Sequence, residues 1–295
     1  MSKATISWVL LAILGLIWGS SFILMKRGMH AIDGTLLFSS VQVASLRMLI
    51  AGLIFLPFSV YFFRKITEIK HLLYFGMVGF FGNFIPAYLF TYAETGLSTS
   101  LTGILNSLTP IFTLLIGLML FKKKIHKLQI VGLLIAASGV SVLLLSGKDV
   151  SLSGSYLQIS AVVGATLCYA ISVNVIKYSL ANYSAIEIAS IAFSLTLIPS
   201  LYITFDSGAI PFLEKEPKAM EGLFFIGILS VFGTAISLVL FNRLIALSST
   251  LFASSVTYLI PLVAVCIGIQ FGETINYTQV LGMIVILLGV YFSNK

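Results

Sequence analysis

Arg47 is a cationic side chain well inside an apolar stretch of the chain, residues 38–63. A charged group within a membrane segment costs about 3 kcal/mol on insertion scales unless it meets water or a partner. Arg47 is therefore a candidate anchor for the anionic group of a small solute. The alternative interpretation is that its guanidinium pins the helix to backbone carbonyls or to a neighbouring polar loop.

A second set of polar residues shares one face of a predicted helix. Thr99, Thr102, Asn106 and Thr109 recur at intervals of three and four residues, which places them on the same side of that helix. Amides fix the polar groups of a solute, and aromatic rings accept its apolar part. The alternative is that such residues only hydrogen-bond one helix to the next. The substrate-binding candidates are Arg47, Trp18, Asn83, Asn106, Tyr169, Asn174 and Tyr258.

Two prolines and one glutamate are candidates for controlling movement. Pro110 and Pro261 each remove a helical hydrogen bond and favour a bend, which acts either as a gate or as a static kink. Glu94 follows an apolar stretch and is the candidate for proton coupling. The alternative is an ordinary solvated carboxylate, so facilitated diffusion, proton exchange and solute exchange all stay open.

The composition excludes an ordinary soluble protein. Of the 295 residues, 59% are hydrophobic and 9% are charged, with a mean hydropathy of +1.09, whereas a soluble domain has about 25% charged residues. The net charge of +7 comes from basic residues in small groups between apolar stretches, so we expect no nucleic-acid partner. Cys168 and Cys266 lie inside apolar stretches, which favours burial over a disulfide, a redox role or a metal site. We expect no metal and no cofactor.

Ten apolar stretches have about the length that crosses a bilayer as a helix. They contain no alternation of polar and apolar residues, which argues against membrane strands and leaves helices. We therefore predict an all-α integral membrane protein with ten transmembrane helices. The predicted spans are residues 6–25, 38–63, 72–93, 99–121, 128–146, 156–176, 186–205, 222–241, 250–271 and 278–292.

The distribution of Lys and Arg between the loops predicts the orientation. Placing the N-terminus in the cytoplasm puts most basic residues on the inner side, with the cluster at residues 122–127 as the strongest signal. Ten spans then place both termini in the cytoplasm. The first apolar stretch lacks a basic leader beyond Lys3 and a small-residue cleavage site, so we expect it to stay as a helix. The predicted location is the inner, or plasma, membrane.

The chain also resembles itself at a constant offset. A shift of 151 residues pairs Gly76 with Gly227, Pro110 with Pro261, and Ser21 with Ser172, among others. The pattern predicts a duplication, with one five-helix unit at residues 1–147 and the other at 148–295. Because five is odd, the second unit enters the membrane from the opposite side, which gives two inverted repeats. Such repeats place the substrate site near the midplane and support alternating access.

Several short motifs recur in a recognisable order. Trp18-Gly19-Ser20-Ser21-Phe22 is followed by Arg47, by Ser107-Leu108-Thr109-Pro110-Ile111-Phe112, and by the stretch from Leu128 to Val140 with its copy from Gln279 to Val290. On these residues the chain resembles the EamA-type branch of the drug/metabolite transporter superfamily over nearly its whole length. The resemblance implies a ten-helix bundle, a central cavity lined mainly by helices one, three, four, six, eight and nine, and export of amino acids or other metabolites. A Gly-Glu pair typical of the family is present at Gly272-Glu273 but is replaced by Lys122-Lys123 in the first half.

We therefore expect a secondary transporter that moves small organic solutes by alternating access, in the direction of export. An intramembrane enzyme acting on lipid-linked substrates is the alternative from another class, but the clustered acidic residues or metal ligands that it would need are not visible. An uncoupled channel is a third interpretation. No Walker-type phosphate loop is present, so ATP-driven pumping is not expected. The expected partners are a small-molecule substrate and the lipid bilayer, with the chain as a monomer or weak homodimer.

Overall fold

The computed structural model describes residues 2–31, 33–66, 68–97, 99–122, 126–146, 156–263 and 277–293. Within these ranges the chain is helical and forms no strand, apart from an isolated bridge between His30 and Leu36. The all-α prediction is confirmed for this part of the chain. Cys266, Gly272 and Glu273 lie outside the described residues, as do residues 264–271 of the span predicted at residues 250–271.

The helical elements follow one another with few breaks, and two of the segments are π-helical. Their bounds are α1 (Lys3–Met29), α2 (Ser40–Phe62), η1 (Phe63–Lys65), α3 (Ile69–Gly79), η2 (Phe80–Phe84), α4 (Ile85–Ala93), α5 (Thr99–Asn106), α6 (Thr109–Phe121), α7 (Lys127–Ser146), α8 (Tyr156–Ser179), α9 (Ala185–Asp206), α10 (Ala209–Lys215), α11 (Ala219–Ile228), η3 (Leu229–Ile236), α12 (Ser237–Leu247), α13 (Thr250–Ser254), η4 (Ser255–Tyr258) and α15 (Tyr277–Ser293).

Six continuous helical stretches among the described residues are long and apolar enough to cross a bilayer. They are Lys3–Met29, Ser40–Lys65, Ile69–Ala93, Tyr156–Ser179, Ala185–Asp206 and Ala219–Leu247. Four further apolar helices are shorter: Thr109–Phe121, Lys127–Gly139, Thr250–Val263 and Val280–Phe292. All ten fall within the predicted spans or overlap them.

Large apolar side chains cover the outside of the bundle, as a lipid-facing surface requires. Leu16 is 61% exposed, Val60 63%, Ile198 78% and Phe224 65%. Each belongs to one of the six long stretches. Since a water-soluble protein rarely exposes a contiguous apolar surface of this kind, these side chains fit contact with lipid.

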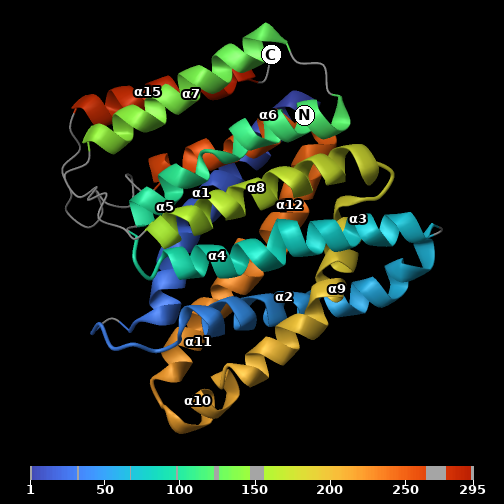
Figure 1. Ribbon diagram of the computed structural model, residues 1–295, viewed down its shortest axis with the longest axis vertical. Helices are drawn as coiled ribbons and strands as arrows, with labels where there is room; N and C mark the ends of the chain where they lie inside the picture. Colours follow the sequence, from blue (N-terminus) through green and yellow to red (C-terminus); the bar gives the residue numbers. More distant parts are fainter. Residues whose placement is uncertain are drawn as a thin grey trace.

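Figure 1 shows the arrangement of the helices. α7 and α15 pack together along one edge of the bundle, and α2 packs against α9 near the other edge. Between them lie α1, α8, α12 and the helices α3 to α6. Most helices run across the view, so their connections gather at two ends. We call these the Glu94 end, which holds residues 33–39, 94–97 and 206–208, and the Lys177 end, which holds residues 63–66 and 180–184.

Polar caps define where several helices begin. Ser39 accepts from the backbone N–H of Gln42, and the Gln42 side chain accepts in return from the Ser39 backbone. Ser184 and Glu187 form the same reciprocal arrangement at the start of α9. Such capping boxes satisfy backbone donors that have no partner within the helix, and this fixes the start of α2 and α9.

Both π-helical segments interrupt long spans at related places. η2 separates α3 from α4, and η3 separates α11 from α12. The offset that relates the two halves of the sequence carries Phe80–Phe84 onto residues 231–235, which lie within η3. A π segment inserts an extra residue into a helical turn and often occurs at functional sites.

The predicted proline positions also coincide with interruptions. The span predicted at residues 99–121 is broken between α5 and α6 at Ser107 and Leu108, and Pro110 is the second residue of the new helix. In the second half of the chain the 3-10 segment η4 precedes Pro261. Because proline cannot donate a backbone hydrogen bond, the helix changes its pattern in the turn before each proline.

Glycines allow the closest helix contacts. A Cβ added at Gly289 would lie 2.3 Å from the backbone N of Ala136, and one at Gly139 would lie 2.8 Å from the backbone N of Ile286. These glycines therefore let α7 and α15 approach backbone to backbone. Gly15 and Gly19, the GxxxG pair on α1, lie against the side chains of Leu259 and Val263, as expected for small residues at a membrane helix interface.

Candidate functional site

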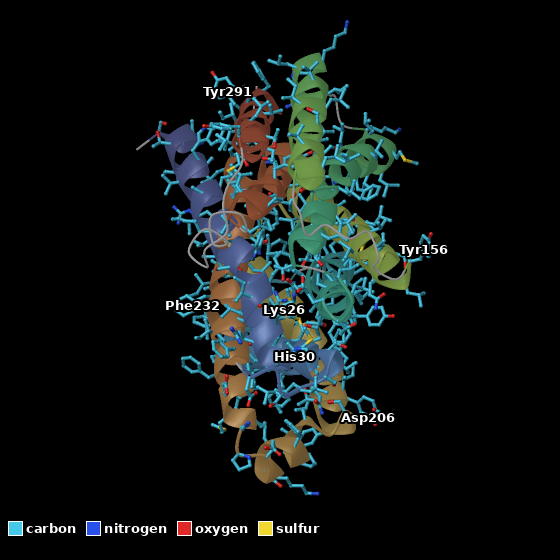
Figure 2. The ribbon with its side chains drawn as sticks, turned by 90° about the vertical axis from the view of Figure 1, so that its left-hand side faces the viewer. Lys26, His30, Tyr156, Asp206, Phe232 and Tyr291 are labelled. Atoms are coloured by element: carbon cyan, nitrogen blue, oxygen red, sulfur yellow. The ribbon has the colours of Figure 1, made fainter. Side chains whose placement is uncertain are left out.

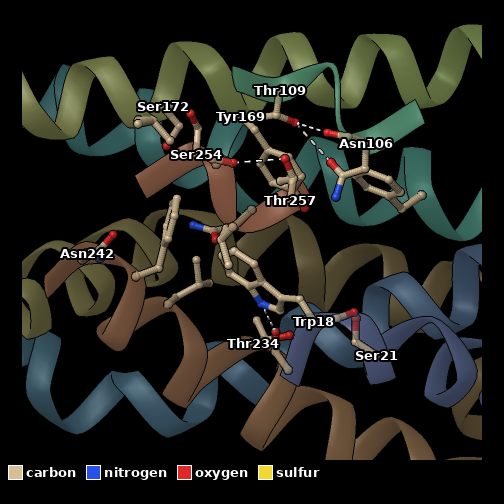
Figure 3. A pocket seen from close by; sticks show the side chains of 18 of the residues that line it. Trp18, Ser21, Asn106, Thr109, Tyr169, Ser172, Thr234, Asn242, Ser254 and Thr257 are labelled. Carbon is tan, nitrogen blue, oxygen red and sulfur yellow. Dashed lines mark hydrogen bonds between the residues drawn. The ribbon is translucent and has the colours of Figure 1, made fainter. Parts of the chain in front are cut away.

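A cavity lies between the helices near the middle of the bundle (Figure 3). It encloses about 1010 Å³ of space outside the protein atoms, its open part included. Its lining comes from α1, α2, the α3 to α6 region, α8, α9, η3, α12, α13 and η4. The wall includes the six helices that the family resemblance implies, and α2 and α9 add residues to it.

Arg47 contributes the positive charge of the cavity wall. Its Nε donates to Oγ1 of Thr234 at 2.7 Å, and its Nη1 lies 3.9 Å from the sulfur of Met25. Within the described ranges, no carboxylate is within ion-pair distance of this guanidinium. Since arginine carries five N–H donors, the bond to Thr234 and the contact with Met25 use only part of its hydrogen-bonding capacity, and the side chain lines the cavity.

Two aromatic pairs form part of the wall. The indole of Trp18 meets the ring of Phe241 edge-on with centroids 5.0 Å apart, and the ring of Tyr169 stacks on Phe90 at 5.7 Å. The shift of 151 residues aligns Trp18 with Tyr169 and Phe90 with Phe241, so the two pairs are equivalent. Trp18 is held further by its Nε1, which donates to the carbonyl of Gly233 and to Ser237 Oγ, both at 3.1 Å.

The π segments place two polar side chains at the cavity. Nδ2 of Asn83 donates to the carbonyl of Val78 at 3.3 Å, and Oγ1 of Thr234 donates to that of Leu229 at 3.2 Å. Each acceptor lies five residues before its donor. Asn83 and Thr234 are again equivalent positions of the two halves. Oδ1 of Asn83 is buried and has no hydrogen-bond partner among the described residues, which leaves an acceptor for a solute.

Short hydrogen bonds from threonine hydroxyls to backbone carbonyls line the cavity in the segments that precede Pro110 and Pro261 (Figure 3). Oγ1 of Thr109 donates to the backbone carbonyl of Asn106 at 2.7 Å and approaches its side-chain oxygen at 3.2 Å. Beside these residues, Oγ1 of Thr257 donates to the carbonyl of Ser254 at 3.0 Å. These hydroxyls satisfy carbonyls that the interrupted helices leave free.

The structure brings five of the seven predicted binding residues together on the cavity wall. They are Trp18, Arg47, Asn83, Asn106 and Tyr169. Asn174 and Tyr258 lie outside the lining and are completely buried. The Asn174 amide donates to the carbonyls of Thr113 and Ala170 at 3.0 and 2.9 Å, so it links helices. Tyr258 packs in an apolar cluster.

The other predicted residues lie near the cavity but not on its wall. Pro110 and Pro261 are buried close to the lining residues Thr109 and Ile260. Glu94 lies one helical turn beyond Phe90, toward the Glu94 end, and is 4% exposed. The predicted face of Thr99, Thr102, Asn106 and Thr109 is divided, since the last two line the cavity and the first two lie beside Glu94.

Sequence reasoning missed several lining residues. These are chiefly the polar Ser172 and Asn242 and the apolar Met25, Met48 and Phe193. The internal offset pairs Ser172 with Ser21, which also lines the cavity, so this signal was present. No comparable signal separates the apolar residues from others in the same spans. Among the described residues there is no group of three or more potential metal ligands.

Comparison with known proteins gives a consistent result. The model of the EamA-like transporter family matches residues 6–145 and again residues 157–295. The chain is 27% identical to an uncharacterized transporter of Archaeoglobus fulgidus, over 96% of this chain and 97% of that protein. It is 23% identical to a probable amino-acid metabolite efflux pump of Salmonella typhimurium, over 94% and 91% of the two chains.

Two further matches agree with these. The uncharacterized inner membrane transporter YedA of Escherichia coli is 27% identical over 93% of this chain and 86% of its own. One crystal structure superposes with a TM-score of 0.70 at 13% identity, over 99% of this chain and 96% of the other. At that identity the superposition shows the fold alone.

Proposed function

The chain belongs to the EamA-like transporter family and transports small solutes, and we propose that these solutes are amino acids or related metabolites, exported across the inner membrane by alternating access. Membership of this family assigns transport rather than catalysis to the chain. The matched relatives in Salmonella typhimurium and Escherichia coli are named as amino-acid metabolite efflux pumps and as an inner membrane transporter. Those names support both the solute class and the location.

The observation that carries the proposal is the guanidinium of Arg47 in the cavity wall, which has no anionic partner among the described residues. A charge that is withdrawn from water is costly unless it is paired, and a solute carboxylate would supply the missing partner in bidentate form. The rings of Trp18 and Tyr169 and the Oδ1 of Asn83 complete a site with one cationic, one hydrogen-bond-accepting and one apolar component. An amino acid has a carboxylate, an ammonium and a side chain to match them.

Contacts between equivalent positions of the two halves support the inverted repeat of residues 1–147 and 148–295. Trp18 of the first unit touches Phe241 of the second, and Tyr169 of the second touches Phe90 of the first. With this division, the cavity lies between the two units. Two similar units in opposite orientation can exchange contacts at one end for equivalent contacts at the other, which is the geometry that alternating access uses.

The ends of the chain and its basic residues support the orientation. Both termini lie toward the Lys177 end in Figure 1. That end also carries Lys3, Arg64, Lys65 and Lys127. Because Lys and Arg are in excess on cytoplasmic loops, we place the Lys177 end in the cytoplasm and the Glu94 end outside.

A flux assay in liposomes tests the proposal. The purified chain is reconstituted and flux is measured for radiolabelled leucine, putrescine and glucose 6-phosphate. We expect saturable leucine flux, and counterflow when unlabelled leucine is present on the opposite side. Flux that rises linearly without saturation would indicate a channel, and flux equal to that of empty liposomes for all three solutes would reject the proposal. Protein carrying Arg47→Gln serves as the matched comparison for leucine flux.

A further inference from the structure

Two lysines at equivalent positions of the two halves lie at opposite ends of the bundle and have different partners. At the Lys177 end, Nζ of Lys177 donates to the carbonyls of Ile245 at 2.8 Å and Ser248 at 2.6 Å. Lys177 thereby fixes α8 to the C-terminal end of α12. These carbonyls cannot titrate, so the link does not depend on a carboxylate that changes its charge near neutral pH.

At the Glu94 end, Lys26 and Glu94 occupy the positions equivalent to Lys177 and Ile245. The shift of 151 residues aligns Lys26 with Lys177 and Glu94 with Ile245. Lys26, on α1, is exposed and lies near enough to Glu94 to favour its ionised form. Figure 2 views the molecule from the Glu94 end and shows Lys26 and His30 near the middle of that view. Lys177 is thus bonded to backbone carbonyls, whereas its equivalent Lys26 lies near the titratable carboxylate of Glu94.

The carboxylate of Glu94 is buried and incompletely paired. Its Oε2 accepts a hydrogen bond from Oγ1 of Thr99 at 3.1 Å, and its Oε1 is buried without a hydrogen-bond partner among the described residues. Burial raises the pKa of Glu94 to about 7, against the opposing effects of Lys26 and of hydrogen bonds from Thr102 and Thr99. A protonated carboxyl at this place therefore has a free energy close to that of the ionised form at neutral pH.

The polar groups at Glu94 and at its neighbour Gly96 come from three elements. α1 presents the ammonium of Lys26, and α5 presents the hydroxyls of Thr99 and Thr102. From α8, the neutral amide of Gln158 lies against Gly96, two residues beyond Glu94. Among the described residues, Lys26 is the charged group that acts on this carboxylate.

An apolar cluster connects this site to the cavity. Phe22 precedes Lys26 by one helical turn and Phe90 precedes Glu94 by one turn, and their rings meet at 6.0 Å. Both phenylalanines line the cavity. The same cluster continues to Ala93 and Leu97 beside Glu94, so it fills the route between the cavity and the Glu94 end.

We propose that Glu94 is a proton-binding site that controls the opening of the cavity at the Glu94 end, an inference that rests on the proposed transport function. The ionised carboxylate attracts Lys26 and holds α1 against α4 and α5, with the apolar cluster closed. A proton taken up from the outside removes that attraction, and α1 is free to separate. The acceptors of Lys177 in the described part of the chain are backbone carbonyls, so we assign proton control to the Glu94 end.

Labelling of a cysteine in the cavity tests the site without a substrate. Ser21, which lines the cavity on α1, is replaced by cysteine in a chain that also carries Cys168→Ala and Cys266→Ala. A membrane-impermeant maleimide is added from the Glu94 side, and each rate is divided by the rate of the denatured chain at the same pH. The normalised rate should rise about tenfold between about pH 8 and pH 6, following the protonated fraction of a group that titrates near neutrality.

Three variants distinguish Glu94 from other titrating groups. Glu94→Gln should label rapidly at both pH values, whereas Glu214→Gln, which alters an exposed glutamate on α10, should behave like the parent chain. Lys26→Met keeps the carboxyl group but removes the ammonium that it attracts, so this variant should also label rapidly at both pH values. A parent rate independent of pH, or a pH dependence that persists in Glu94→Gln or in Lys26→Met, would overturn the proposal. Since the labelling involves no solute, its outcome is independent of the flux assay.

Discussion

The Nε of Arg47 lies 2.7 Å from Oγ1 of Thr234, and this bond joins α2 to the π segment η3. Oγ1 of Thr234 in turn donates to the carbonyl of Leu229. The hydroxyl therefore uses its proton on the backbone and accepts from the guanidinium. With one N–H fixed in this way, the guanidinium plane is oriented while its other donors remain available to a carboxylate.

Thr234→Val should weaken solute binding through the position of Arg47. Valine keeps the shape of threonine and removes the acceptor, and a hydrogen bond to a charged group contributes about 1.5 to 3 kcal/mol. We expect the KM for leucine flux to rise about tenfold or more, with a smaller change in kcat. Thr234→Ser retains the hydroxyl and should stay close to the parent chain. An unchanged KM in Thr234→Val would show that this bond does not orient the site.

Replacing Arg47 should change which solutes are accepted. Arg47→Gln removes the charge that pairs with a carboxylate, so leucine flux should fall by about tenfold or more, whereas putrescine, a dication without a carboxylate, should not lose flux. Arg47→Lys keeps the charge but not the bidentate geometry and should lie between the two. Equal effects of Arg47→Gln on leucine and putrescine, with normal amounts of folded protein, would reject Arg47 as the anchor.

The sequence singles out Arg47, which lies on the cavity wall, because a charged side chain inside an apolar span is stable only where it faces the bundle interior or water. It cannot make the same distinction for asparagines and tyrosines. Asn83 faces the cavity and Asn174 bonds to the carbonyl of Thr113, yet both are single amides in apolar spans. Which face they occupy depends on the rotation of each helix in the bundle, and neither hydropathy nor spacing contains that information.

The π segments were also beyond sequence reasoning. They depend on one hydrogen-bond register replacing another inside a continuous span, and the residues of η2 and η3 have no composition that signals the change. The internal offset of the sequence relates the two segments, but it says nothing of their backbone. By contrast, the interruptions before Pro110 and Pro261 follow from the chemistry of proline, and the sequence predicts a change of helix there.

Glycine substitutions should separate close packing from helix propensity. Gly289→Ala would place a Cβ 2.3 Å from the backbone N of Ala136, and because backbone atoms cannot turn aside, we expect a loss of about 1 to 3 kcal/mol of stability. Gly227→Ala adds a Cβ with no atom within 4 Å and should stabilise its helix by about 0.5 to 1 kcal/mol. Thermal unfolding in detergent measures both. A Gly289→Ala chain as stable as the parent would show that α7 and α15 can move apart at no cost.

The orientation of the chain gives the last prediction. Both termini lie toward the end that also carries Lys3, Arg64, Lys65 and Lys127, and positive loops face the cytoplasm. A fluorescent protein that matures only in the cytoplasm should therefore be bright when fused to either terminus, and alkaline phosphatase fused at the same places should be inactive. A phosphatase inserted after Gly208, at the Glu94 end, should be active. If the two terminal fusions report different sides of the membrane, the two five-helix units do not face opposite ways, and the cavity between them loses its basis for alternating access.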